Sequence, residues 1–221
     1  MRGPTSILTA TIALALSAAP SRAELIVFDN LAAGSPNGSF GVSNSRWVTQ
    51  SFSTTSSGFI LSEVALRLWN QNGTSGNFEL QVWDALGASG RPGAQVGSAI
   101  YTGLAENLHS EYGSLLTVSG LNVTLVPDTA YYLVAAGANL ADVPGSFGPR
   151  PGTLYWDATD VVTSPAYDTG DSGGNWRGPF SQNLYMKVTA ASAPIPEPGT
   201  WAAMAIFAGG AAYAGWRRRK S

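Results

Sequence analysis

Ile60 to Trp69 reads ILSEVALRLW, and the pattern of this stretch decides the class of fold. Apolar side chains stand at Ile60, Val64, Leu66 and Leu68, with Glu63, Ala65 and Arg67 between them. A period of two is typical of a β-strand with one face in a core, because successive side chains of a strand point to opposite faces. The stretch therefore predicts a half-buried strand.

Nine further segments carry a similar strand signal on both sides of this stretch. We expect strands at Leu25–Phe28, Trp47–Phe52, Phe78–Trp83, Val96–Tyr101, Leu115–Val118, Val123–Val126, Tyr131–Ala136, Thr153–Trp156 and Leu184–Thr189. Clusters of Gly, Asn, Pro and Asp separate them, and the 26 glycines of the chain suit such turns. Together the segments predict an all-β fold, an antiparallel β-sandwich of jelly-roll-like type.

Composition limits what the region 24–193 can be. Its length of about 170 residues suffices for one domain with a core and is too short for two. The region holds six cations against thirteen carboxylates, a net charge of about −7, so nucleic acid is an unsuitable partner. The chain has no cysteine, which excludes disulfides, thiol catalysis and thiolate metal sites.

The C-terminal segment has a different composition. An uncharged apolar stretch of 17 residues, Thr200 to Trp216, precedes Arg217, Arg218, Arg219 and Lys220. As a helix it would span about 25 Å, slightly less than the roughly 30 Å of a bilayer's hydrocarbon core. The four cations place the C-terminus on the cytoplasmic side and the region before Pro196 outside. We therefore expect one transmembrane helix at about 200–216, with a basic membrane stop at 217–220.

The triplet Pro196-Glu197-Pro198 stands directly before this apolar stretch. With the short helix and the terminal arginines, segment 194–221 resembles the PEP-CTERM sorting signal of Gram-negative bacteria. The resemblance implies that an exosortase, a membrane-embedded cysteine transpeptidase, recognises Pro196, Glu197 and Pro198. It also implies that the helix holds the protein in the inner membrane until a cut near the motif releases the protein to the cell surface or matrix.

The N-terminus has the pattern of a signal peptide. Arg2 supplies a positive charge, Ser6 to Ala19 is mostly apolar, and Ser21-Arg22-Ala23 has small residues where a signal peptidase reads the chain. We expect cleavage after Ala23, so residues 1–23 form the signal peptide and the exported domain spans 24–193. This domain would face the periplasm while the precursor is anchored in the inner membrane.

A second resemblance concerns the exported domain. The motifs in order are Ser51-Phe52, Leu-Ser-x-Val-x-Leu at 61–66, GNFELQVWD at 76–84, Arg91-Pro92-Gly93, and a Thr-x-Tyr-Tyr-Leu-Val strand within 125–134. This order is similar to the "choice-of-anchor" ectodomains of bacterial surface proteins, which occur with interchangeable C-terminal anchors. The resemblance implies a surface module without an assigned activity.

Catalytic patterns are weak, and we expect no enzyme. The single histidine, His109, lies in a polar connection, where Ser110 or Ser114 could only formally complete a triad. A glycosidase would need two acids facing one cleft, and the available acids are Glu63, Glu79, Glu106 and Glu111. Of these, Glu63 and Glu79 are expected to point to solvent from their strands.

Two acidic segments bear on metal binding. Asp157–Asp160 and Asp168–Asn175 place carboxylates and glycines on expected loops, which is the oxygen chemistry that calcium prefers. Their spacing differs from that of an EF-hand loop, and Asp and Asn are common in turns because they cap their own backbone. The turn interpretation is favoured, calcium at either loop stays open, and no cofactor is expected.

The tryptophans of the domain indicate an alternative function, the binding of polysaccharide. The domain holds Trp47, Trp69, Trp83, Trp156 and Trp176. Trp69 and Trp83 are expected to pack in the core, whereas Trp176, Trp156 and Trp47 are candidates for stacking on sugar rings, with Trp176 the most exposed. We expect a non-catalytic surface or extracellular-matrix protein, associated with exopolysaccharide or biofilm, with a polysaccharide-binding module as the alternative.

Overall fold

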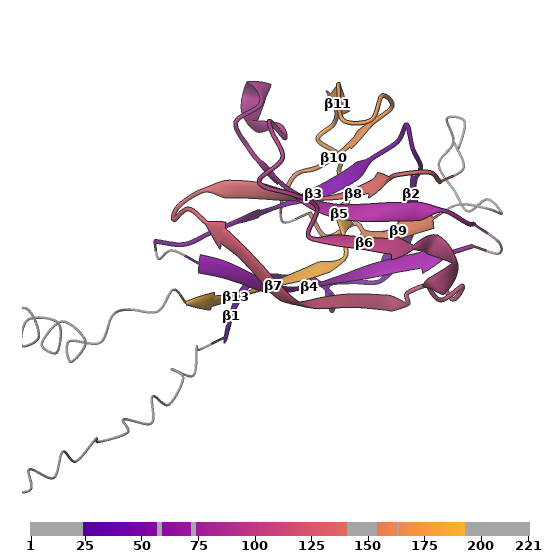
Figure 1. Cartoon of the computed structure of the whole chain (residues 1–221), viewed down its shortest axis with the longest axis horizontal. Coiled ribbons are helices and arrows are strands. Elements are labelled where there is room, and N and C mark those ends of the chain that lie inside the picture. The colour runs from indigo at the N-terminus through magenta and orange to yellow at the C-terminus, as the bar shows by residue number, and fades with distance from the viewer. Residues whose placement is uncertain (1–23, 57–58, 72–73, 141–153, 163, 193–221) are drawn as a thin grey trace, which may run out of the picture.

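The computed structural model describes residues 24–56, 59–71, 74–140, 154–162 and 164–192. These residues form two antiparallel β-sheets packed face to face (Figure 1), without an α-helix. The strands are β1 (Glu24–Asp29), β2 (Pro36–Val42), β3 (Val48–Ser53), β4 (Phe59–Asn70), β5 (Asn77–Asp84), β6 (Tyr101–Leu104), β7 (Leu115–Leu125), β8 (Ala130–Gly137), β9 (Leu154–Thr159), β10 (Ala166–Thr169), β11 (Trp176–Arg177), β12 (Asn183–Leu184) and β13 (Met186–Ser192). Two short 3₁₀ turns are η1 (Ala88–Gly90) and η2 (Ala105–Asn107). The expected signal peptide and C-terminal helix lie outside the described residues.

The first sheet is organised around β4, the strand predicted by the alternating stretch. Residues 59–67 of β4 pair with β7 on one side, residues 59–66 pair with β13 on the other, and residues 68–70 pair with β9. β1 pairs with the far side of β13, while β2 and β12 pair with β9. The second sheet has the order β11-β10-β3-β8-β5-β6.

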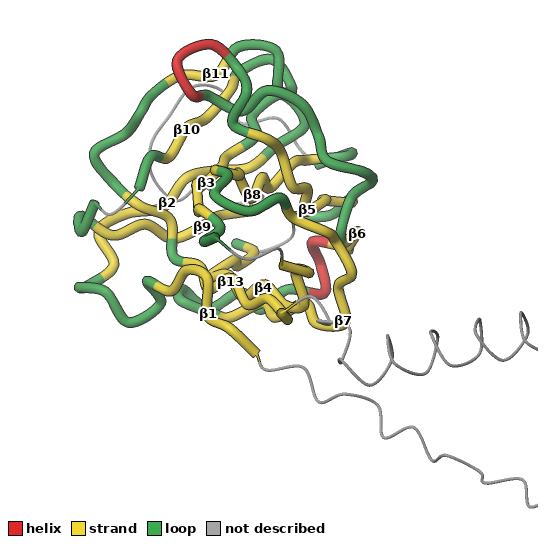
Figure 2. Tube along the Cα trace, turned by 90° about the vertical axis from the view of Figure 1, so that its left-hand side faces the viewer, coloured by secondary structure: helices red, strands yellow, loops and turns green. Residues whose placement is uncertain are grey.

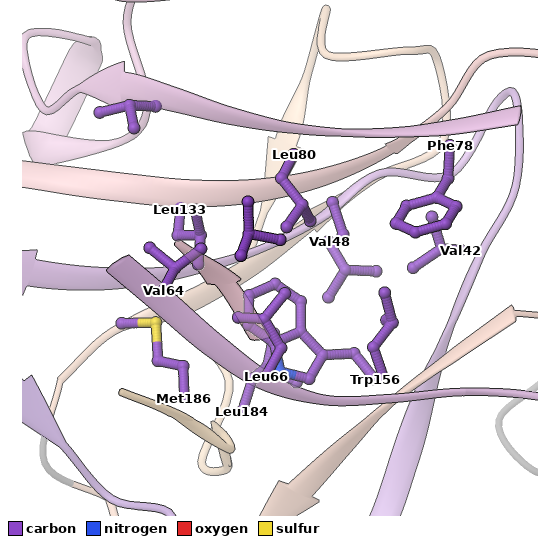
Figure 3. Close-up of a cluster of buried hydrophobic side chains, with 14 of the residues drawn as sticks. Val42, Val48, Val64, Leu66, Phe78, Leu80, Leu133, Trp156, Leu184 and Met186 are labelled. Carbon is purple, nitrogen blue, oxygen red and sulfur yellow. The ribbon is translucent and has the colours of Figure 1, made fainter. Parts of the chain in front are cut away.

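The core fills the space between the two sheets. Val64, Leu66 and Leu68 point inward from β4, each at most 1% exposed, and Glu63 and Arg67 between them are partly exposed. Figure 3 shows side chains of both sheets meeting in this layer, with Val48, Phe78, Leu80 and Leu133 opposite Val64, Leu66, Trp156, Leu184 and Met186. Apolar burial of this kind stabilises a fold by about 25 cal/mol per Å², so this layer is the main source of stability. The predicted all-β class is confirmed.

Several predicted strand boundaries were wrong. Residues 96–100 form no strand: Val96 N and Ile100 N donate to Val82 O and Leu80 O, but the chain loops out between them, where Gly97 has a φ of 72°. The expected strands 115–118 and 123–126 are one strand, β7, interrupted by a bulge. β2 and β10 were missed, because PNGSFGV and AYDT have turn composition and take their extended form from pairing with neighbours.

The two ends of the described chain lie side by side. Glu24 at the start of β1 pairs with Ala191 in β13, and Ser192 pairs with Phe59 at the start of β4. Figure 2 shows β1 and β13 as neighbours at this end of the sandwich. The last described residue, Ser192, therefore lies close to the first described strand.

Candidate functional site

The sorting residues Pro196, Glu197 and Pro198 and the basic residues 217–220 lie outside the described residues, but the strand that carries them is described. β13 lies between β1 and β4. Asn30, 4% exposed, holds the start of β13: its Oδ1 accepts from Met186 N at 2.7 Å, and its Nδ2 donates to Leu184 O at 3.0 Å. The attachment point of the tail is therefore an internal strand of the first sheet.

The described residues were also considered for a membrane-spanning helix. Among them, no helix has the length and apolar character that a membrane span requires. The apolar stretch 200–216 falls outside the described part of the chain, so the expected transmembrane helix stays a prediction.

The outer face of the second sheet carries an aromatic cluster formed by Trp47, Trp83, Tyr132, Tyr167 and Trp176, called here the outer aromatic cluster. Tyr132 comes from β8, where it alternates with core residues. Trp83 contacts Trp47 and Trp176 edge to face, with ring centroids 6.1 and 5.7 Å apart. Loops cover part of this face, because Tyr132 Oη donates to Gly90 O and Arg91 Nη1 donates to Trp176 O at 2.9 Å.

The structure corrects the expected exposure of the candidate stacking residues. Trp176 is only 6% exposed because the β10–β11 hairpin folds it back onto the sheet against Trp83. Trp156 is fully buried in the central core, and its Nε1 donates to Tyr185 O at 2.9 Å. Trp47 is partly exposed, as is Trp83, which had been expected in the core. Trp47, Trp156 and Trp176 therefore do not form one exposed face.

An ion-pair network fixes the strands beside this cluster. Asp168 in β10 is 2% exposed and accepts hydrogen bonds from two arginines. Arg46 Nε and Nη2 bind Asp168 Oδ2 at 2.9 and 2.7 Å, and Arg177 Nε binds Oδ1 at 3.0 Å. The Arg46 side chain is 9% exposed, whereas that of Arg177 is 60% exposed. Asp168 therefore compensates a buried cation.

The acidic segments considered for calcium serve other purposes in the described structure. Asp157 and Asp168 lie in strands, contrary to the expected loops. Asp171 is bound by Thr169 Oγ1 and by the backbone and side chain of Asn175, and these hydrogen bonds, that of Thr169 foremost, lower its pKa to about 2. No group of three or more His, Cys, Asp or Glu able to hold a metal occurs among the described residues.

Asp157 forms a second polar site, on the outer face of the first sheet. The carboxyl is fully buried, and Trp69 Nε1 donates to its Oδ1 at 2.7 Å. Its Oδ2 accepts no hydrogen bond of normal geometry from the described residues. Burial raises the pKa of Asp157 to about 6, against the opposing effects of the Trp69 indole, the Gly113 amide and the Arg67 charge. Trp69 stacks on Tyr155 and meets the half-exposed Tyr112 edge to face.

Of the acid candidates, Glu63 and Glu79 lie apart from each other. His109 is exposed, and Ser114 Oγ donates to Glu111 O at 2.8 Å. Glu63 on β4 binds Ser119 Oγ, and Glu79 on β5 binds Gln81 Nε2, so the two carboxylates lie on different sheets. Both face outward, since the inward residues of their strands alternate with them.

Comparison with known proteins identifies the tail. Residues 194–220 match the family model of the PEP-CTERM protein-sorting motif. No curated protein matches the chain. The PEP-CTERM motif implies a secreted, membrane-transiting protein that is sorted to the cell surface. The chain carries the PEP-CTERM motif at 194–220, as its sequence predicts, and this motif implies processing by an exosortase.

Proposed function

We propose that this chain is a non-catalytic surface or extracellular-matrix module that its C-terminal tail delivers and that an exosortase releases. One observation carries the proposal: residues 194–220 match the PEP-CTERM sorting motif and follow β13, the last described strand. A cut near Pro196–Pro198 would therefore remove none of the described strands.

The start of the domain supports the same proposal. The cleavage expected after Ala23 would leave all described residues of β1, Glu24–Asp29, in the exported chain. The precursor would then be anchored in the inner membrane by residues 200–216, with the sandwich in the periplasm. After processing, the domain would reach the cell surface or the exopolysaccharide matrix of a Gram-negative biofilm.

Deletion of Thr200–Ser221 tests this delivery. The truncated protein should appear in the soluble periplasmic or secreted fraction, since the signal peptide is removed and the described residues of the sandwich hold no helix able to span a membrane. The full chain in a host without exosortase should remain in the membrane fraction and serves as the control. Stable membrane association of the truncated protein would refute the delivery role of the tail.

Polysaccharide binding is the second candidate, and the outer aromatic cluster favours it. Trp47 and Trp83 are both partly exposed and lie edge to face on one sheet surface. The exposed Arg91 belongs to the loop that contacts this cluster. Partly exposed indole rings beside a cation can stack on sugar rings and bind their hydroxyl or carboxylate groups.

A further inference from the structure

β7 is a long sheet edge that no other described segment covers. It has eleven residues and pairs with β4 on one side. None of its backbone groups is hydrogen-bonded to any described segment besides β4. A row of unpaired backbone groups of this kind is a template for a further strand.

The other edges are protected in the usual ways. Native edge strands carry charges or proline or are very short, since these features prevent pairing with another chain. β1 has Glu24 and Asp29 at its ends, β2 begins at Pro36, and β6, β11 and β12 have four, two and two residues. Residues 113–126, which include β7, contain neither a charged residue nor a proline. β7 is therefore the unprotected long edge of the described fold.

A bulge limits the part of β7 that can accept a straight partner. Ser119 pairs with Glu63 and Val123 with Leu61, so residues 120–122 stand opposite a single residue of β4. Gly120 has a φ of 74° there, and Figure 1 shows β7 bending along its length. Leu115–Ser119 pairs in continuous register and remains straight.

The surface around the bulge is also uncharged. A groove of about 480 Å³ lies between residues 96–100 and 120–124, and none of these ten residues is charged. Val96, Ile100, Leu121 and Val123 pack against the core from its walls. Figure 2 shows β6 and β7 on the same side of the sandwich, so the uncharged edges of both sheets share one face. The Glu63 carboxylate on β4 accepts a hydrogen bond of 2.7 Å from Ser119 Oγ.

The net charge of the domain and the symmetry of an antiparallel edge bear on which partner could pair with β7. Region 24–193 has a net charge of about −7, so two copies repel each other over most of their surfaces. The edge 113–126 adds no charge to this repulsion, and an antiparallel edge is self-complementary about a twofold axis. We propose that Leu115–Ser119 pairs antiparallel with the same segment of a second copy, with Thr117 opposite Thr117 and Leu115 opposite Ser119. Two sandwiches then share a continuous sheet.

The proposed pairing segment lies far along β4 from the last described residue of the chain. β7 begins opposite Arg67 of β4, whereas β13 ends opposite Phe59. Eight residues of extended strand separate these positions, about 27 Å at 3.4 Å per residue. The pairing segment is therefore distant from Ser192, the last described residue.

The natural chain has no cysteine, so single cysteines in the full-length protein test the contact and its register. Directly opposed residues of an antiparallel pair have Cβ atoms about 4.5–5.5 Å apart, close enough for a disulfide after small adjustments. Thr117→Cys, exported to the oxidising periplasm, should give a disulfide-linked dimer on a non-reducing gel. Leu86→Cys, with Leu86 83% exposed outside this face, is the matched control and should give at least tenfold less dimer.

Register is tested by co-expression. Leu115→Cys and Ser119→Cys should each form little dimer alone and should form a mixed dimer together, at a yield comparable to that of Thr117→Cys. Equal crosslinking of Thr117→Cys and Leu86→Cys would overturn the proposal. So would crosslinking of Leu115→Cys alone as strong as the mixed pair, because that result indicates random collision or another register.

Discussion

Trp69 Nε1 donates a hydrogen bond of 2.7 Å to Oδ1 of Asp157, a carboxyl with no solvent exposure. Burial raises the pKa of this group to about 6, above its ordinary value of 3.8. The folded protein therefore binds more protons than the unfolded chain between about pH 4 and 6. Asp157 lowers stability as the pH rises through this range, and the full penalty remains above it.

Asp157→Asn should reduce this pH dependence. Asn retains an oxygen for the Trp69 indole and carries no charge, so the variant should gain stability relative to wild type as the pH rises from 4.5 to 7. The change is at most about 3 kcal/mol, the value of roughly two pKa units. Urea unfolding at both pH values measures it, with Asp160→Asn, at an exposed carboxyl, as the control. Parallel pH profiles for wild type and Asp157→Asn would contradict the assignment.

The Arg46–Asp168–Arg177 network predicts an asymmetry between its members. Asp168→Ala leaves the Arg46 cation buried without its carboxylate, a change that typically costs about 3–5 kcal/mol. Arg177→Ala removes a largely exposed partner and should cost about 1 kcal/mol or less. Urea unfolding of the protein truncated after the domain measures both changes. Similar losses of unfolding free energy for the two variants would show that the buried Arg46–Asp168 pair is not the main contribution of this network to stability.

The strands with the clearest period of two were the most predictable. β4 and β5 appear where the alternation places them, because one face of each lies in the core. The segment 96–101 was predicted as a strand, but only its last residue belongs to β6. Its apolar residues pack on the core without sheet pairing, and the sequence does not distinguish these two forms of burial.

The exposure of the tryptophans was less predictable. Trp176 follows two glycines, which favours a solvent-exposed loop, yet the hairpin buries it on the outer face of the second sheet. Coverage of an outer face depends on how loops fold over the sheet, and the period of a strand carries no information about it. Trp156 lies in β9, whose described residues are buried on both faces, so alternation is absent there as well.

The polysaccharide alternative now depends on Trp47 and Trp83. A bound glycan should quench the fluorescence of these partly exposed indoles, and Trp83→Ala should lose most of the response. Stacking on one aromatic ring contributes about 0.5–1.5 kcal/mol, equivalent to roughly a two- to tenfold weaker affinity. The control is Trp69→Phe, which changes a buried indole in the other sheet. An unchanged signal across acidic and neutral polysaccharides would reject this alternative.

The sorting motif should be separable from the fold. Glu197 lies after the last described strand, and the prolines on both sides of it disfavour a helix through this position. Glu197→Ala should therefore leave the unfolding temperature of the sandwich unchanged while it affects delivery. A lower unfolding temperature for Glu197→Ala than for wild type would show that the tail belongs to the fold.

The most direct test of the account is the processing of wild type and Glu197→Ala in a host that has an exosortase. Membrane fractionation, with intact mass measurement of the released protein, identifies where each chain is cut. We expect wild type to be released with a C-terminus near Pro196–Pro198 and without the apolar stretch. Glu197→Ala should accumulate in the membrane as the uncleaved precursor. Release of Glu197→Ala with the same mass and yield as wild type would contradict the account.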